Sequence, residues 1–427
     1  MNHAPYRHPD MLEATRLTRA GRLTEAMALL QGVLGGAAPP AATPGTGGTP
    51  SADGASRVID ATAETVEVTG PRPSSLAGQA FGTAGGRPVG GTAGTAQPPL
   101  PEAVRDLLDR LGKNMPSAGP TVAPDPLPDG ARFLAATFAN EAGGRDYKLY
   151  VPASYRGQPV PLVVMLHGCT QSPDDFAAGT RMNALAEEHG CLVAYPAQAA
   201  SANPQRCWNW FSPGDQGRGR GEPSILAGIT RQVMRDHAVD PARVYVAGMS
   251  AGGAAAAVMG EAYPDLYAAV GVHSGLPCGA AGDLPSALAA MRQGAPGPAR
   301  DGARPAGERR GLVPTIVFHG DRDGTVSPRN GDQVIARARA GTAGELQATA
   351  AVQRGQVPGG RSYSRALHAD AGGRAVLEQW VVHGAGHAWS GGGTAGSYTD
   401  PHGPDASREM LRFFLEHQHP AAGQPVH

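Results

Sequence analysis

The sequence has few lysines, few cysteines and no long hydrophobic run. Only Lys113 and Lys148 are lysines, and 36 basic residues nearly balance 37 acidic ones, which gives a formal net charge of −1. Because binding to nucleic acid or to an anionic membrane surface depends on excess positive charge, neither is expected as the main partner. No apolar run reaches the roughly 18 residues of a membrane-spanning helix, so no membrane span is expected.

The four cysteines, Cys169, Cys191, Cys207 and Cys278, are too few for a disulfide framework in a chain of 427 residues. The first residues lack the basic start and apolar stretch of a secretory signal, which predicts a cytoplasmic protein or one exported by another route. No His/Cys/Asp cluster has metal-ligand spacing, and no glycine-rich loop with a lysine could cradle a phosphate. We therefore expect neither a metal nor a cofactor.

Composition divides the chain into segments. Residues 1–34 have apolar side chains at helical spacing, and this short helical segment is expected to contact either a partner or the rest of the chain. Residues 35–130 are rich in Gly, Ala, Pro and Thr, which predicts a mostly disordered linker with one short helix near 101–112. Residues 131–419 form the predicted catalytic domain, and 420–427 are a tail.

Strand-like and helical patterns alternate through the predicted domain. The strand-like runs are 146–155, 161–168, 191–197, 243–248, 267–275, 315–323 and 375–387. The helical patterns are 180–189, 223–237, 251–262, 328–340 and 405–417. This alternation predicts an α/β fold with a largely parallel sheet covered by helices on both faces. Ligands of such sheets bind beyond the carboxyl ends of the strands, where the polar, glycine-bearing loops of this sequence occur.

One of these loops carries the sequence "VYVAGMSAGG", in which Ser250 fits the pattern G-x-S-x-G. A strand before the serine and a helix after it are the context in which this pattern forms a sharp turn that exposes a nucleophile. The alternative is a small-residue corner that only packs well. Strand and helix together favour the nucleophile.

A serine nucleophile needs a base, and the base needs a carboxylate to orient it. His387 lies late in the chain in the loop "HGAGHAWSGG", and His383 is its nearby competitor. Two carboxylates follow the strand "TIVFHG", and we prefer Asp323 over Asp321. The order serine, aspartate, histidine is that of the α/β-hydrolase fold.

The oxyanion formed by attack on an ester needs two backbone N–H donors. The residue after the nucleophile, Ala251, is expected to supply one. The loop "LHGCT", which ends an early strand, is expected to supply the other through Cys169. His167 in the same loop is expected to brace it rather than to act as a base.

Several motifs in this order closely resemble the polyhydroxybutyrate (PHB) depolymerase family of esterases, over about residues 140–417. They are "LHGCTQSPDDF", "CWNWF", "GEPSILAGITRQV", "VYVAGMSAGGAAAAVM", "VFHGDRD" and "GHAWSGG". The resemblance implies an α/β-hydrolase that cleaves carboxylic esters through an acyl-enzyme, with Ser250, Asp323 and His387 as its triad. It also implies an extracellular location, as for the secreted members of this family, as an alternative to the cytoplasm.

The resemblance also bears on the loop over the site. It suggests a disulfide between Cys169 and Cys207, whereas a reducing cytosol would leave two free thiols. Trp208, Trp210 and Trp389 are candidates for lining an apolar substrate pocket. For the aromatic residues of "CWNWF", the alternative is that they pack this loop onto the hydrophobic core.

The sequence therefore favours a serine esterase acting on short hydroxyalkanoate esters or oligomers. Release of acetyl or feruloyl groups from polysaccharides is the first alternative. A peptidase of the prolyl-oligopeptidase type ranks lower, because no charged anchor for a peptide terminus accompanies the motifs. A non-catalytic interaction protein is opposed by the complete set of serine, aspartate and histidine.

Overall fold

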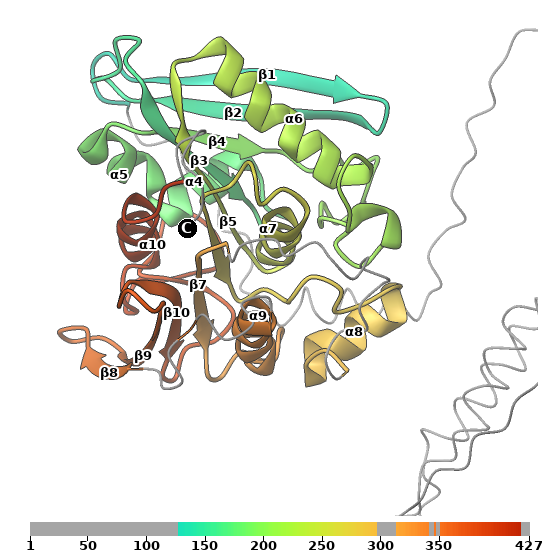
Figure 1. Ribbon diagram of the computed structural model, residues 1–427, viewed down its shortest axis with the longest axis vertical. Coiled ribbons are helices and arrows are strands. Elements are labelled where there is room, and N and C mark those ends of the chain that lie inside the picture. Colours follow the sequence, from blue (N-terminus) through green and yellow to red (C-terminus); the bar gives the residue numbers. More distant parts are fainter. Residues whose placement is uncertain (1–126, 297–312, 341–345, 347–350, 420–427) are drawn as a thin grey trace, which may run out of the picture. The chain divides into compact units, whose positions relative to one another are not determined.

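The computed structural model describes residues 127–296, 313–340, 346 and 351–419 (Figure 1). The predicted helical segment 1–34, the linker through residue 126 with its helix near 101–112, and the tail 420–427 lie outside the described residues. The described ranges cover most of the predicted catalytic domain.

A single large sheet organises the described residues, with the strand order β1-β2-β4-β3-β5-β6-β7-β10-β9-β8. Its strands are β1 (Arg132–Asn140), β2 (Gly143–Val151), β3 (Val160–Leu166), β4 (Leu192–Pro196), β5 (Val239–Met249), β6 (Ala269–His273), β7 (Thr315–Gly320), β8 (Ala351–Gln356), β9 (Ser362–Ala369) and β10 (Ala375–Val382). The strands from β4 to β10 in this order are parallel. The two outer strands on each side pair antiparallel.

The parallel strands are buried on both faces. In β3, Leu162, Val164 and Leu166 belong to one apolar cluster. Val163 and Met165, which alternate with them, belong to the other. Because successive side chains of a strand point to opposite faces, a continuous apolar run is what a sheet between two helical layers requires.

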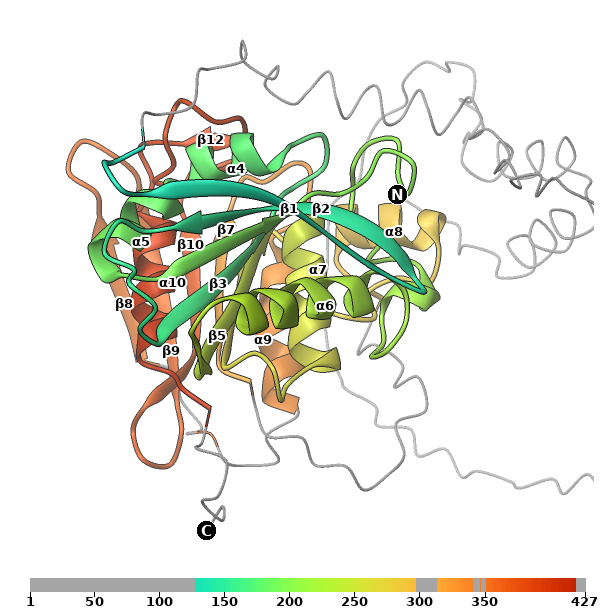
Figure 2. The same ribbon diagram turned by 90° about the horizontal axis from the view of Figure 1, so that it is seen from above.

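Helices form the two outer layers (Figures 1 and 2). The helices are α4 (Pro173–Thr180), α5 (Met182–His189), α6 (Gly221–Asp236), α7 (Ala251–Ala262), α8 (Leu284–Gln293), α9 (Arg329–Ala340) and α10 (Ala406–Leu415). Helices α6, α7 and α9 cover one face of the sheet, and α4, α5 and α10 cover the other. The predicted α/β fold, with a mostly parallel sheet and helices on both faces, is confirmed. No helix in the described ranges is long and apolar enough to cross a membrane.

Candidate active site

Ser250 occupies the turn between β5 and α7. Its backbone has φ 57° and ψ −120°, a left-handed conformation that is strained for a residue with a side chain. The Ser250 N–H donates to the carbonyl oxygen of His273 at 2.9 Å, which ties the turn to the end of the neighbouring strand β6. The serine is 8% exposed. The turn that carries Ser250 thus lies at the carboxyl end of β5, between this strand and helix α7.

The two glycines of this pattern are required by the close approach of backbones. A Cβ atom on Gly248 would lie 2.3 Å from the carbonyl oxygen of Gly252. A Cβ atom on Gly252 would lie 2.0 Å from the carbonyl oxygen of Leu166 in β3. Both obstacles are backbone atoms, so a side chain at either position forces strands and helix apart.

His387 and Asp323 form a buried hydrogen-bonded pair. The Nδ1–H of His387 donates to Oδ2 of Asp323 at 2.7 Å, and the two side chains are 6% and 0% exposed. The other carboxylate oxygen accepts the backbone N–H groups of Thr325 and Val326 at 2.9 and 2.8 Å. The Nε2 atom of His387 is buried and has no hydrogen-bond partner among the described residues. With Nδ1 donating, Nε2 of the neutral ring is the atom free to accept a proton.

A second histidine, His319, also faces Asp323. Its Nε2 lies 3.4 Å from Oδ2 of Asp323 and 2.9 Å from the carbonyl oxygen of Val326. Burial alone would raise the pKa of Asp323, but the charges and hydrogen bonds of His387 and His319 outweigh burial and hold this pKa well below its usual range. The aspartate is therefore ionised at neutral pH and suited to stabilise an imidazolium at His387.

The competing residues Asp321 and His383 pair with each other. The Nδ1–H of His383 donates to Oδ2 of Asp321 at 2.9 Å, and Nε2 of His383 lies 2.9 Å from Oγ of Ser364. Both members of the pair are about two-fifths exposed, at 39% and 37%. The structure thus brings Asp323, rather than Asp321, onto His387.

His273 connects the serine turn with the loop that carries His387. Its carbonyl oxygen accepts the Ser250 N–H, and its Nε2 accepts the N–H of Ser390 at 3.0 Å. Burial lowers the pKa of His273 to about 3, which keeps the ring neutral and Nε2 an acceptor. His273 and His319 were not predicted from the sequence, although each lies at the carboxyl end of a buried parallel strand, where a polar residue is the available signal.

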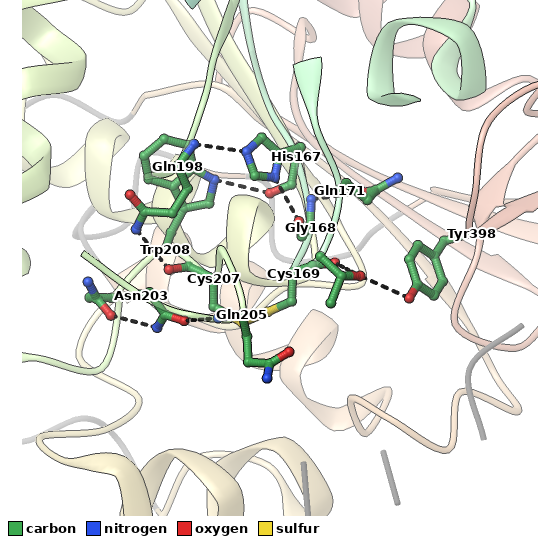
Figure 3. Close-up of a disulfide and its surroundings, with 12 residues drawn as sticks. His167, Gly168, Cys169, Gln171, Gln198, Asn203, Gln205, Cys207, Trp208 and Tyr398 are labelled. Atoms are coloured by element: carbon green, nitrogen blue, oxygen red, sulfur yellow. Dashed lines mark hydrogen bonds between the residues drawn. A yellow bond between two sulfur atoms is a disulfide. The ribbon is translucent and has the colours of Figure 1, made fainter. Parts of the chain in front are cut away.

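The two predicted oxyanion donors have free N–H groups. Neither Cys169 nor Ala251 donates its backbone N–H to any acceptor in the part of the chain that the structure describes. The loop of Cys169 is close to the serine, because a Cβ atom on Gly168 would lie 3.6 Å from Cβ of Ser250. A disulfide joins Cys169 to Cys207 across 38 residues (Figure 3).

Two of the three tryptophans predicted to line a pocket are inaccessible. Trp208 is 0% exposed and donates its Nε1–H to the carbonyl oxygen of His167 at 3.1 Å. Trp389 is 1% exposed and stacks on His273 with ring centroids 4.8 Å apart. Trp210 is 6% exposed. For Trp208 and Trp389 the pocket prediction is corrected, because their rings brace loops against the core and present no surface to a substrate.

The site offers no set of metal ligands. No group of three or more His, Cys, Asp or Glu side chains that could hold a metal ion occurs in the described ranges.

Comparison with known proteins identifies similar sequences and folds. Residues 145–361 match the family described as Esterase PHB depolymerase. The chain is 36% identical over 207 residues to poly(3-hydroxyalkanoate) depolymerase C of Paucimonas lemoignei, which covers 47% of this chain and 49% of the relative. It is 28% identical over 266 residues to poly(3-hydroxybutyrate) depolymerase of Ralstonia pickettii, and this match covers 59% of this chain and 53% of the relative. The chain thus spans about half the length of these curated relatives.

A solved structure shares the fold. The acetyl xylan esterase from Aspergillus awamori superposes with a TM-score of 0.51 at 20% sequence identity, covering 67% of this chain and 99% of that one. At this identity the likeness concerns the fold alone.

Proposed function

Because the chain belongs to the esterase PHB depolymerase family, we propose that it is a serine carboxylic ester hydrolase acting on short hydroxyalkanoate esters or oligomers. The observation that carries the proposal is the buried pair of His387 and Asp323, in which Nδ1 of His387 lies 2.7 Å from Oδ2 of Asp323. Nε2 of His387 has no hydrogen-bond partner among the described residues. Catalysis is assigned to the predicted domain 131–419.

Acylation uses the serine and the free histidine nitrogen. Oγ of Ser250 attacks the ester carbonyl carbon while Nε2 of His387 takes the hydroxyl proton. The carbonyl oxygen becomes an oxyanion, which accepts the N–H groups of Cys169 and Ala251. Asp323 stabilises the imidazolium through the short hydrogen bond to Nδ1. The C–O bond then breaks, and the leaving alkoxide takes the proton from Nε2.

Deacylation repeats these steps with water. Nε2 of His387 removes a proton from a water molecule, whose oxygen attacks the acyl carbon of the Ser250 ester. The second tetrahedral intermediate uses the same two N–H donors. When it collapses, the carboxylic acid leaves and Oγ regains its proton from His387.

The class of acyl group follows from the relatives. The names of the two curated relatives are those of depolymerases of poly(3-hydroxyalkanoates), polyesters of 3-hydroxy acids. A 3-hydroxyacyl ester is therefore the substrate we assign first. Acetyl and feruloyl esters of polysaccharides are the competing class, and the solved structure with this fold is named an acetyl xylan esterase.

The disulfide favours a location outside the cytoplasm. Disulfides persist in oxidising compartments and are rare in a reducing cytosol. The bond between Cys169 and Cys207 therefore supports the extracellular alternative over the cytoplasmic expectation. Mass spectrometry of the protein from its natural source, alkylated without reduction, tests this proposal. Alkylated thiols at both positions would contradict it.

The proposed function is tested with a substrate panel and two serine variants. The panel holds p-nitrophenyl butyrate, 3-hydroxybutyrate oligomers, solid PHB, acetyl xylan and feruloyl esters. Ser250→Ala is expected to lose at least about three orders of magnitude in kcat. Ser364→Ala is the matched control, because Ser364 lies 2.9 Å from Nε2 of His383, a histidine that is likewise paired with an aspartate. Equal activity of wild type and Ser250→Ala would overturn the proposal.

A further inference from the structure

One peptide group carries an oxyanion donor. The peptide between Gly168 and Cys169 has the Cys169 N–H on one side and the Gly168 carbonyl on the other, because a trans peptide points the two in opposite directions. The carbonyl oxygen accepts Nδ1–H of His167 at 2.7 Å. The Cys169 N–H, which no acceptor in the described residues takes up, therefore points away from the His167 ring.

The His167 ring is fixed in one tautomer. Its Nε2 accepts the backbone N–H of Gln198 at 3.1 Å, so the proton of the neutral ring is on Nδ1 (Figure 3). The ring is 1% exposed, and burial lowers the pKa of His167 to about 4. The neutral ring with a protonated Nδ1 is thus the form present at neutral pH.

A neighbouring loop holds His167 and Cys169 from the other side. Trp208 donates its Nε1–H to the carbonyl oxygen of His167, and the centroids of the Trp208 and His167 rings lie 5.5 Å apart. Cys207, the residue before Trp208, forms the disulfide with Cys169 (Figure 3). The adjacent peptide is also anchored, because the Gly168 N–H donates to Oε1 of Gln171 at 2.9 Å. Among these groups around the Gly168–Cys169 peptide, only the Cys169 N–H has no partner in the described residues.

We propose that His167 is a positioning residue that fixes the orientation of the Gly168–Cys169 peptide and so keeps the oxyanion donor of Cys169 directed toward the substrate. This inference rests on the proposed esterase function. The Gly168 carbonyl also accepts the Gln171 N–H, but over the longer distance of 3.4 Å. Without the short hydrogen bond from Nδ1–H of His167, the peptide can rotate, its carbonyl dipole can replace the N–H at the oxyanion position, and the transition state loses a donor. Substrate binding in the ground state depends much less on this donor.

The test compares His167→Phe and His167→Gln with wild type. His417→Phe is the matched control, because His417 is also 1% exposed and its ring nitrogens also hydrogen-bond to the backbone, in this case to the carbonyl oxygens of Phe413 and Ala375. Steady-state rates are measured with p-nitrophenyl butyrate and divided by the number of active sites titrated with a rapidly acylating ester. Binding of phenylboronic acid, which forms a tetrahedral adduct with the nucleophile, is measured in parallel.

For both His167 variants, kcat per titrated site is expected to fall about 10- to 100-fold. The affinity for phenylboronic acid is expected to fall by a similar factor, whereas KM is expected to change less than about threefold. The His417 control is expected to keep kcat and boronate affinity. A variant that only loses folded protein would titrate fewer sites and keep its kcat per site. Wild-type kcat per site in the His167 variants, or a loss confined to KM, would overturn the inference. An inactive wild type would instead refute the proposed function.

A measurement on the unmutated protein avoids any effect on folding. In ¹⁵N-histidine-labelled protein, the ring nitrogens of His167, assigned from the signals missing in His167→Gln, report the tautomer directly. A proton on Nδ1 at pH 7 is expected. A proton on Nε2 alone would overturn the inference, because the Gly168 carbonyl would then have no donor from the ring.

Discussion

Asparagine at position 323 changes the charge of the acid while keeping its shape. One Asp323 oxygen accepts two backbone N–H groups, those of Thr325 and Val326, and the other accepts Nδ1–H of His387. An asparagine has one acceptor oxygen. If that oxygen accepts the two backbone N–H groups, the NH₂ group of the asparagine faces Nδ1 of His387. Nδ1 must then act as a hydrogen-bond acceptor. The ring proton then moves to Nε2, and His387 can no longer take the serine proton.

The size of the effect can be worked out from the geometry. An imidazolium on His387 would have its Nδ1 only 2.7 Å from the Asp323 carboxylate, and neither side chain is more than 6% exposed. Unit charges roughly 3 to 4 Å apart at an effective dielectric constant of about 20 attract by about 4 to 6 kcal/mol. At about 1.4 kcal/mol per factor of ten, Asp323→Asn should lower kcat by about three to four orders of magnitude.

The assay is hydrolysis of p-nitrophenyl butyrate by wild type, Asp323→Asn and Asp321→Asn, with thermal unfolding to verify the fold. Asp321 is the matched control, since it also binds a histidine, at 2.9 Å, but its side chain is 37% exposed. Its variant should stay within about fivefold of wild type, because screening by solvent weakens exposed pairs. A larger loss at Asp321, or an Asp323 variant within tenfold of wild type, would refute the reasoning.

Three further predictions concern packing, pH and redox state. Gly252→Ala should lower the free energy of unfolding by about 3 kcal/mol or more, because its Cβ would lie 2.0 Å from a backbone oxygen of β3; an unchanged denaturation midpoint would contradict this. The pKa values of His167 and His273 in the folded state are about 4 and 3, below about 6.5 in the unfolded chain, so the unfolded state binds more protons as the pH falls. Each histidine should thus lower the free energy of unfolding by about 2 kcal/mol when the pH falls from neutral to 5. Denaturant unfolding at pH 7.5 and pH 5 checks this, and equal stability at the two pH values would count against it. Reduction of the Cys169–Cys207 bond, which spans 38 residues, should destabilise the domain by about 4 kcal/mol in the chain-entropy model and lower kcat; a melting temperature unaffected by reductant would show otherwise.

The sequence predicted the parts of the fold that repeat a strong local pattern. The parallel strands are continuous apolar runs. Helix α6 has one buried, mostly apolar face, whereas α7 is small-residue-rich and buried nearly all round. The outer hairpin of β8 and β9 was not predicted, because β8 is mostly exposed, β9 is mostly half-buried, and neither strand alternates clearly between apolar and polar residues. Helix α4 was missed as well, since it has only eight residues and its start depends on the Ser172 cap rather than on periodicity.

The candidate site could be predicted where a residue type and its place after a strand coincide. Ser250, Asp323 and His387 were selected in this way, and the structure places the aspartate and the histidine 2.7 Å apart. The roles of Trp208 and Trp389 could not be predicted, because an aromatic residue in a loop suits a pocket wall and a buried brace equally well. Only the burial and the hydrogen-bond partners of the indole rings distinguish the two.

The nucleophile is tested most directly by covalent labelling with a fluorophosphonate, followed by digestion and mass spectrometry. We predict one adduct per chain, on Ser250, and a parallel loss of esterase activity as the label is incorporated. Ser250→Ala should remain unlabelled. An adduct on another serine, such as Ser364, or full esterase activity after stoichiometric labelling of Ser250, would contradict the assignment of Ser250 as the nucleophile.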